Sequence, residues 1–183
     1  MVNINKHKLT LLQQEILKLL YKKAGLSLNQ RQIAKSLNVS SPAVLKALPI
    51  LKKLNYIIYE KDKETGRVSI KLNLENRDII NYKRAENLKQ IYESGLFDCL
   101  EKEFPGSTII LFGSYSRGDD LVNSDIDIAV INTEEKKINL SKFEKVLERK
   151  INLNFFDSFQ NINKYLKENL ANGILLAGGF VFN

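Results

Sequence analysis

The residues whose types and spacing could carry chemistry lie in two short segments in the second half of this 183-residue chain. Gly113 and Ser114 directly follow the β-branched and apolar run 108–112, which predicts a strand, and Asp125 and Asp127 come a few residues later. Glycine lets the backbone approach a ligand closely, and a turn that opens a helix presents amide groups to an anion. The first segment therefore suits a triphosphate. Its candidate nucleotide-binding residues are Gly113, Ser114, Ser116 and Arg117.

The two aspartates begin a second apolar run that is typical of a strand. Side chains alternate faces along a strand, so Asp125 and Asp127 share one surface while Ile126 and Ile128 face the core. Two carboxylates this close repel each other unless a cation lies between them, and Mg²⁺ prefers oxygen ligands. Asp125 and Asp127 are therefore the candidate metal ligands. A solvated strand edge and an ordinary tight turn are the alternatives that involve no ligand.

Taken together, Gly113-Ser114, a spacer of ten residues and Asp125-Ile126-Asp127 resemble the signature of the DNA polymerase β nucleotidyltransferase superfamily, above all its minimal nucleotidyltransferases. The resemblance covers roughly residues 97–178 and implies a small mixed sheet flanked by helices. It also implies that the Gly-Ser turn holds the triphosphate of an NTP, with ATP the first choice, and that the aspartates hold two Mg²⁺ ions. Arg117-Gly118 matches the family's arginine-glycine pair.

The resemblance fails at the third carboxylate, which in the family lies on a later strand and activates the acceptor hydroxyl. The matching run, residues 151–157, offers Asn152 and Asn154 on its polar face. Asparagine ligates a metal through its carbonyl but cannot accept a proton at neutral pH. Asp157 falls on the opposite face if the strand is regular. The candidate catalytic residues are Asp125, Asp127, Asn152 and Asn154.

Charge divides the chain into two parts. Residues 1–73 hold 14 Lys or Arg against 4 Asp or Glu, whereas residues 74–183 hold 14 against 17. A small domain with ten excess positive charges attracts polyanions and gains affinity by releasing their counterions. A merely soluble basic surface is the alternative.

The basic part has the pattern of three helices followed by a hairpin. Apolar residues at helical spacing predict helices over residues 9–24 and 30–37, and Ser41 with Pro42 predicts the start of a third. The alternating runs 56–60 and 67–72 predict a hairpin. Residues 9–73 therefore resemble the winged-helix family, whose third helix enters the major groove of double-stranded DNA and whose wing meets phosphates. Ser40, Ser41 and Lys46 would face the groove, and Lys61, Lys63 and Arg67 would contact the backbone.

Winged helices also serve as dimerisation or protein-docking modules, so this alternative stays open. Within the third helix Leu45 is expected on the inner side, and Pro49 should kink or shorten the helix because it removes a hydrogen bond. A long amphipathic stretch follows, with Ile79, Tyr82 and Tyr92 among its apolar residues. We expect an α+β chain with a winged helix over residues 1–73, a helical connector over 74–100 and a nucleotidyltransferase domain over 101–183.

Composition excludes several classes of protein. A single cysteine, Cys99, cannot form an internal disulfide, and no secretory leader or membrane-length apolar run is present, so we expect a cytoplasmic protein without a membrane role. The first functional hypothesis is an enzyme that transfers a nucleoside monophosphate to a protein or nucleic-acid hydroxyl, guided by the DNA-binding domain. The alternative is a DNA-binding transcriptional regulator whose degenerate nucleotidyltransferase domain senses a nucleotide or holds a partner protein. A homodimer stays open in both.

Overall fold

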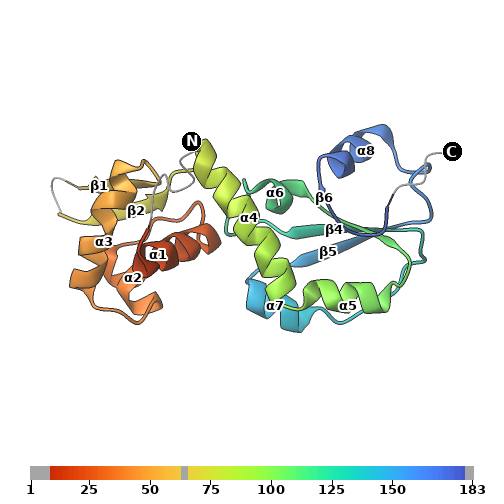
Figure 1. The fold of residues 1–183 in the computed structure, drawn as a ribbon, viewed down its shortest axis with the longest axis horizontal. Helices are drawn as coiled ribbons and strands as arrows, with labels where there is room; N and C mark the ends of the chain where they lie inside the picture. Colours follow the sequence, from red (N-terminus) through yellow and green to blue (C-terminus); the bar gives the residue numbers. More distant parts are fainter. Residues whose placement is uncertain (1–8, 63–65, 180–183) are drawn as a thin grey trace, which may run out of the picture. The chain divides into compact units, whose positions relative to one another are not determined.

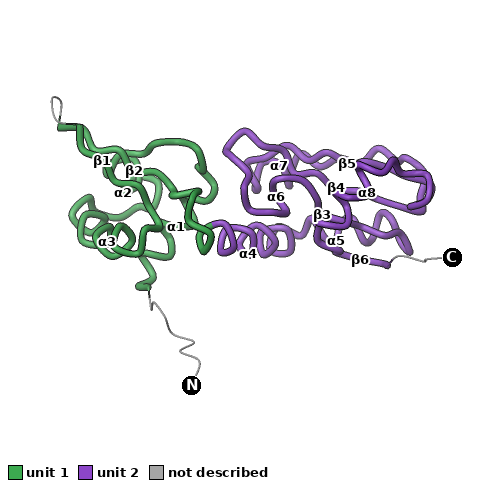
Figure 2. Tube along the Cα trace, turned by 90° about the horizontal axis from the view of Figure 1, so that it is seen from above, with its two compact units in different colours: residues 1–79 green, residues 80–183 purple. Residues whose placement is uncertain are grey.

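The computed structural model describes residues 9–62 and 66–179. Its chain divides into two compact units, Met1–Ile79 and Ile80–Asn183, which Figure 2 colours separately. The expected connector, residues 74–100, is thus divided between the units, with most of it in the second. No helix in the described ranges has the length and apolar character that crossing a membrane requires.

Three helices form most of the first unit (Figure 1): α1 (Leu11–Lys22), α2 (Gln30–Ser36) and α3 (Ser41–Lys53). Thr10 and Asn29 each accept a hydrogen bond from a backbone N–H in the first turn, so both helices start with a capping box. The cap of α3 is Ser40, not Ser41, because the Ser40 hydroxyl accepts from the backbone N–H of Ala43 at 3.3 Å. The helix therefore starts one residue earlier than the sequence predicts.

Of the two effects expected of Pro49, shortening does not occur, because α3 continues for four residues beyond it. The expected inner position of Leu45 was wrong. Leu45 is 46% exposed rather than packed inside, whereas Val44, Leu48 and Leu51 are buried. The buried positions define the inner face, and Leu45 lies just outside it.

A hairpin completes the unit, with β1 (Ile57–Lys61) antiparallel to β2 (Val68–Leu72). Leu28 adds a short bridge to Ile70 through two backbone hydrogen bonds of 2.9 and 2.8 Å. Side chains from all three helices and both strands share one core that includes Ile16, Ile33 and Leu51. The order of three helices and a hairpin over one core confirms the predicted winged helix.

Next in the chain are α4 (Arg77–Glu93) and α5 (Leu96–Glu103), separated at Gly95. The expected apolar face of this stretch was partly wrong, because Tyr82 is 51% and Tyr92 45% exposed. The buried side chains of α4 include Ile79, Lys83, Asn87 and Ile91, which are spaced four residues apart and so lie on one side of the helix.

The second unit is built on a four-stranded sheet of order β5-β4-β3-β6. Its strands are β3 (Thr108–Phe112), β4 (Ile126–Ile131), β5 (Ile151–Phe156) and β6 (Ile174–Ala177). β4 and β5 are parallel, and the other pairs are antiparallel, so the sheet is mixed as the sequence predicts. Short helix α6 (Gly113–Arg117) joins β3 to the segment before β4.

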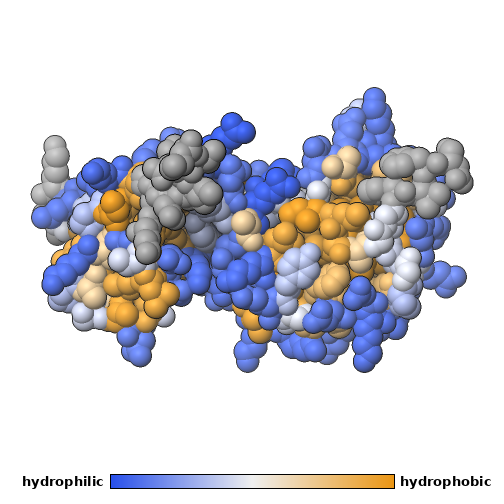
Figure 3. Space-filling view, in the orientation of Figure 1, coloured by the Kyte–Doolittle hydropathy of each residue, from blue (hydrophilic) through white to orange (hydrophobic). Residues whose placement is uncertain are grey.

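Helices cover both faces of this sheet (Figure 1). Residues of α4, α5 and α7 (Ser141–Leu147) pack with Ile109, Ile126 and Ile128 on one face. The other face carries Ile110 and Ala129 under α8 (Lys164–Ala171). Figure 3 shows hydrophobic side chains at the surface over the region of β6, which is an edge strand. The unit is thus a three-layer arrangement, and the aspartates lie on the face that α8 partly covers.

Candidate nucleotide site and nucleic-acid interface

The Gly-Ser turn lies where β3 ends and α6 begins. Gly113 has φ +75°, a conformation that side-chain-bearing residues rarely adopt. A Cβ atom at this position would lie 2.6 Å from Oδ2 of Asp127. Glycine is therefore required twice, by the backbone conformation and by the approach of the turn to the Asp127 carboxylate. The sequence predicted that the backbone at Gly113 could approach a ligand closely. In the structure it also lies close to the Asp127 carboxylate.

The other residues of the turn have different surroundings. Ser114 is half-buried at the start of α6. Ser116 is only 1% exposed, and its hydroxyl donates to the carbonyl of Gly113 at 2.8 Å, so its side chain stabilises the turn from within. Arg117 is exposed, and its Nε lies 3.2 Å from Oδ2 of Asp119. Ser114 and Arg117 are thus accessible to a ligand, whereas Ser116 is placed to hold the backbone that would contact it.

Asp125 and Asp127 lie at the start of β4, half-buried, while Ile126 and Ile128 between and after them are fully buried. β4 and β5 run in parallel with Asp127 opposite Asn152. The Nδ2 atom of Asn152 donates to Oδ2 of Asp125 at 3.1 Å and to Oδ1 of Asp127 at 3.2 Å. Ionised carboxylates only accept hydrogen bonds, so the NH₂ end of the amide must face them. Asn152 thus occupies the position between the two carboxylates.

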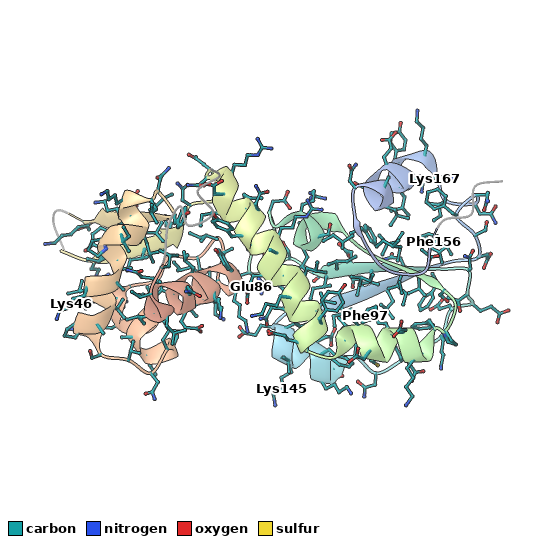
Figure 4. All side chains as sticks on the ribbon, viewed as in Figure 1. Lys46, Glu86, Phe97, Lys145, Phe156 and Lys167 are labelled. Carbon is teal, nitrogen blue, oxygen red and sulfur yellow. The ribbon has the colours of Figure 1, made fainter. Side chains whose placement is uncertain are left out.

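No further acid joins this pair. In the described part of the chain, no third Asp, Glu, His or Cys completes a group that could hold a metal ion. Asn154 lies opposite Ala129, two residues further along β5 on the same face. The β4-β5 register is regular throughout, so no bulge turns Asp157 inward; it follows Phe156, which lies at the α8 end of the strand (Figure 4). Five residues along a strand separate Asp157 from Asn152 by about 16 Å.

A buried charged cluster holds the loop between the two halves of the site. Asp120 is 1% exposed and Lys83 fully buried, and the Lys83 ammonium donates to Oδ1 of Asp120. Nδ2 of Asn87 also donates to this oxygen, at 2.7 Å, and to the backbone carbonyl of Tyr115 at 2.9 Å. An Arg149 nitrogen lies 3.5 Å from Oδ2 of Asp120. Through this cluster α4 fixes both α6 and the loop that leads to Asp125.

The cluster joins two cations to one buried carboxylate. Burial lowers the pKa of Lys83 below its ordinary value, because an ammonium group without water is destabilised, although Asp120 acts in the opposite direction. Gly118 permits the close packing: a Cβ there would lie 2.4 Å from the backbone oxygen of Ile80. Breaking a buried ion pair by removing one partner is costly, so these residues hold the loop strongly.

Sequence reasoning missed this cluster, although a signal was present. Lys83 and Asn87 lie at four-residue spacing between Ile79 and Ile91, on one side of a helix. Polar residues on an apolar stripe need buried partners. Asp120, two residues after the glycine that ends α6, is such a partner.

The candidate DNA contacts lie on α3 and the hairpin. Lys46 points to solvent from α3 (Figure 4), and Ser41 is half-buried in the first turn. The Ser40 hydroxyl is engaged in the cap of α3. Lys61 and Arg67 are exposed on the hairpin, and both line a groove of about 860 Å³ between the hairpin and the start of α2. Arg31 lines the same groove. Lys63 lies outside the described residues.

Comparisons with known proteins match these two regions separately. A family model described as a nucleotidyltransferase domain matches residues 93–176, and one described as an HTH domain matches residues 12–66. No curated protein matches the chain.

Among solved structures, the chain is similar to MepR, a transcription regulator of the Staphylococcus aureus multidrug efflux pump MepA, with 24% identity over 55% of this chain and 72% of MepR, at a TM-score of 0.40. It is also similar to the adhesin competence repressor AdcR of Streptococcus pyogenes, with 26% identity over 55% of this chain and 71% of AdcR, at a TM-score of 0.38. From the family models, the chain combines a helix-turn-helix domain with a nucleotidyltransferase domain.

Proposed function

We propose that this protein is a DNA-binding regulator. Its nucleotidyltransferase domain binds a magnesium nucleoside triphosphate but does not efficiently transfer the nucleoside monophosphate to an acceptor. The observation that carries the proposal is the position of Asn152, whose amide donates to both Asp125 and Asp127. The family resemblance puts a third carboxylate where this strand carries asparagine. The site therefore keeps the groups that bind and lacks the group that would take the acceptor's proton.

The donor set fits a magnesium ion that arrives with its nucleotide. Mg²⁺ keeps several waters and is commonly bound by one or two carboxylates together with substrate phosphates. Neither Asp125 nor Asp127 forms an ion pair with any described residue, so no described side-chain cation neutralises either carboxylate. When bound, the ion would neutralise phosphate charge. The turn from Gly113 to Ser114 would hold the phosphates, with Arg117 adding a positive charge beside them.

Loss of the proton acceptor affects transfer much more than binding. A positioned general base contributes roughly 10²- to 10⁴-fold to rate, and asparagine cannot act as one. Asp157, the next acidic residue along β5, follows the opposite end of the strand. Binding without efficient transfer is the behaviour that this donor set supports.

The test is a comparison of binding and transfer in the same preparation. MgATP affinity is measured by calorimetry, and transfer is followed with ATP labelled on the α-phosphate, the purified chain and duplex DNA as acceptor. We expect saturable, Mg²⁺-dependent binding without label on protein or DNA. Label transfer lost in the Asp125→Asn/Asp127→Asn double variant would replace the proposal with the enzymatic one.

Transfer to a protein or nucleic-acid hydroxyl is the second candidate function. The observation that favours it is the close fit of Gly113 against Asp127, because it places the turn that would hold the phosphates directly beside the carboxylates that would hold the metal. Phosphoryl chemistry depends mainly on positioning and charge neutralisation, which the remaining residues still supply. The same labelling experiment separates the two functions.

Double-stranded DNA is the proposed partner of the first unit. The excess of ten positive charges in residues 1–73, the exposed lysines on α3 and the basic side chains of the groove beside the hairpin support this assignment. The competing proposal is that the winged helix binds a protein partner or a second copy of the chain. Titration of fluorescent duplex DNA at several salt concentrations tests the proposal: a steep linear dependence of log affinity on log salt is expected.

Regulation requires that the nucleotide and DNA affect each other's binding. The boundary between the two units falls inside α4, which also carries Lys83 and Asn87 of the cluster beneath the nucleotide turn. We expect DNA affinity to change when MgATP is added, and MgATP affinity to change by the same factor when DNA is added, because binding coupling is reciprocal. Equal affinities with and without the second ligand would reduce the protein to two independent binding domains.

A further inference from the structure

The exposed side of α3 carries an unusual set of side chains for a helix that would read DNA. Its sequence contains three lysines but no Arg, Asn, Gln, Asp or Glu. Two-pronged recognition of guanine uses Arg or Lys, and that of adenine uses Asn or Gln. The exposed residues of the helix are Pro42, Leu45, Lys46, Pro49, Lys52 and Lys53. Adenine therefore cannot be read from α3 by a paired side-chain hydrogen bond.

Apolar atoms form the middle of this surface. Leu45 is 46% exposed, and together with Pro49 and Tyr59 of β1 it lines a groove of about 190 Å³. The Lys52 ammonium lies 5.2 Å from the centre of the Tyr59 ring, which holds this lysine at the edge of the groove. Figure 3 shows hydrophobic side chains reaching the surface among hydrophilic ones on this unit.

We propose that Leu45 and Pro49 contact the 5-methyl groups of thymine in the major groove, and that Lys46 beside them is the hydrogen-bond donor to guanine. The proposal rests on the proposed binding of DNA by this unit. The 5-methyl group is the apolar feature that DNA displays in the major groove, so it is the base feature that an apolar helix surface can recognise. The preferred sites are then thymine-rich with neighbouring guanine, and adenine is selected through its paired thymine.

Charge favours DNA over an apolar protein partner. Lys46, Lys52 and Lys53 are exposed on the same helix, and residues 1–73 carry ten excess positive charges. A polyanion satisfies these lysines while its thymine methyl groups meet the leucine, whereas an apolar protein surface would leave the lysines without partners. The position of Leu45 also suits the contact, because the N-terminal half of a recognition helix reaches the base edges.

The first step of the test is selection of binding sequences from a random duplex library with the full chain. Thymines of the selected site are then replaced one at a time by deoxyuridine, which lacks only the methyl group, and affinity is measured by fluorescence anisotropy at constant salt. Burying one methyl group contributes roughly a fourfold change in affinity. We expect a loss of about this size at one or two thymines and no change at the others.

Two variants assign the contact to its residue. Leu45→Ala should lose the preference for thymine over deoxyuridine at the position that Leu45 contacts, while keeping the salt dependence of the parent. Lys46→Ala should bind more weakly and keep the preference for thymine. Because Leu45 is half-exposed, its replacement should leave the fold intact, and Leu45→Gln provides a second variant, with circular dichroism as the check.

Equal binding of thymine and deoxyuridine sites by the parent, or a thymine preference that is unchanged at every position in both Leu45 variants, overturns the inference while leaving DNA binding in place. Absence of any DNA binding is a different result, because it overturns the proposed function itself.

Discussion

Asn152 lies directly opposite Asp127 in the parallel pair β4-β5, and its amide nitrogen is 3.2 Å from the Asp127 carboxylate. The same nitrogen is 3.1 Å from Asp125. A neutral donor shared by two acids partly compensates their mutual repulsion, which lets the pair persist without a bound cation. This geometry leads to predictions about metal binding, about the turn and about catalysis.

Replacing both aspartates, Asp125→Asn/Asp127→Asn, should abolish Mg²⁺-dependent ATP binding without unfolding the protein. The change removes both charged metal ligands and also relieves their repulsion, so thermal stability should stay equal or increase. Calorimetry with MgATP and a thermal melt measure the two effects. Asp157→Asn is the matched control, because it removes an exposed carboxylate beyond the other end of the sheet and should bind like the parent.

Gly113→Ala should reduce both stability and nucleotide binding. The new methyl group would lie 2.6 Å from Oδ2 of Asp127, and the backbone at φ +75° costs an alanine about 1–2 kcal/mol. Gly106→Ala is a control in the same unit, since Gly106 has φ +77° and its new methyl group would have nothing within 4 Å. Chemical denaturation should show the backbone cost in both variants. MgATP affinity should fall in Gly113→Ala alone. An equal loss of MgATP affinity in both variants would mean that the contact between the turn and the Asp127 carboxylate does not determine nucleotide binding.

Lys83→Met should change how stability depends on pH. Burial lowers the pKa of Lys83 in the folded chain, while the unfolded chain keeps the ordinary value of about 10.4. Between these two values the unfolded state binds more protons, so the contribution of Lys83 to the free energy of unfolding rises with pH. The difference in stability between parent and variant should therefore move in favour of the parent as pH approaches 10. Urea titrations from pH 7 to 10 measure it, and a constant difference would contradict the lowered pKa.

Arg67→Ala should weaken DNA binding by a similar factor for all sequences. Arg67 is exposed on the hairpin, where a phosphate contact carries no sequence information. Loss of one phosphate contact should reduce the slope of log affinity against log salt by about one unit. Lys145→Ala, an exposed lysine of α7 in the second unit, is the control for a change in net charge (Figure 4). An unchanged slope in Arg67→Ala would remove the hairpin from the phosphate contacts.

The sequence predicted most elements of the fold because their signals are local. Asn29 starts α2, and the β-branched run ending at Phe112 is a strand with the predicted bounds. The cap of α3 was misplaced by one residue because Ser40 and Ser41 both suit the position, and only the hydrogen bond to Ala43 decides between them. Propensity alone does not separate two adjacent serines.

Parts of the site depend on contacts between distant segments and could not be predicted in this way. The alternation of β4 predicted that Asp125 and Asp127 share a face, but not that an amide from β5 lies between them. The cluster of Lys83, Asp120 and Arg149 joins a helix to two loops. Helix faces were predicted from the spacing of apolar residues, on the assumption that polar residues are exposed. A buried ion pair does not follow this assumption, so the spacing could not predict it.

Asn152→Asp tests the central difference between this site and the family it resembles. The new carboxylate would lie beside Asp125 and Asp127 and supply both a third metal ligand and a proton acceptor. Transfer of label from ATP should then rise, and even a part of the roughly 10²- to 10⁴-fold contribution of a general base would be measurable. A second readout does not need activity: three adjacent carboxylates should lower stability without metal, so added Mn²⁺ should raise the melting temperature more in this variant than in the parent.

Two neighbouring positions make the result specific. Asn154→Asp places a carboxylate on the same face but opposite Ala129, so it should gain neither transfer nor the added response to Mn²⁺. Asp157→Ala should behave as the parent, because this side chain follows the far end of β5. If Asn152→Asp gains metal-dependent stability but no transfer, the site binds a metal without being able to position an acceptor, and the nucleotide-binding regulator stands. If it gains neither, Asn152 does not occupy the position of the missing carboxylate, and the explanation for weak transfer fails with it.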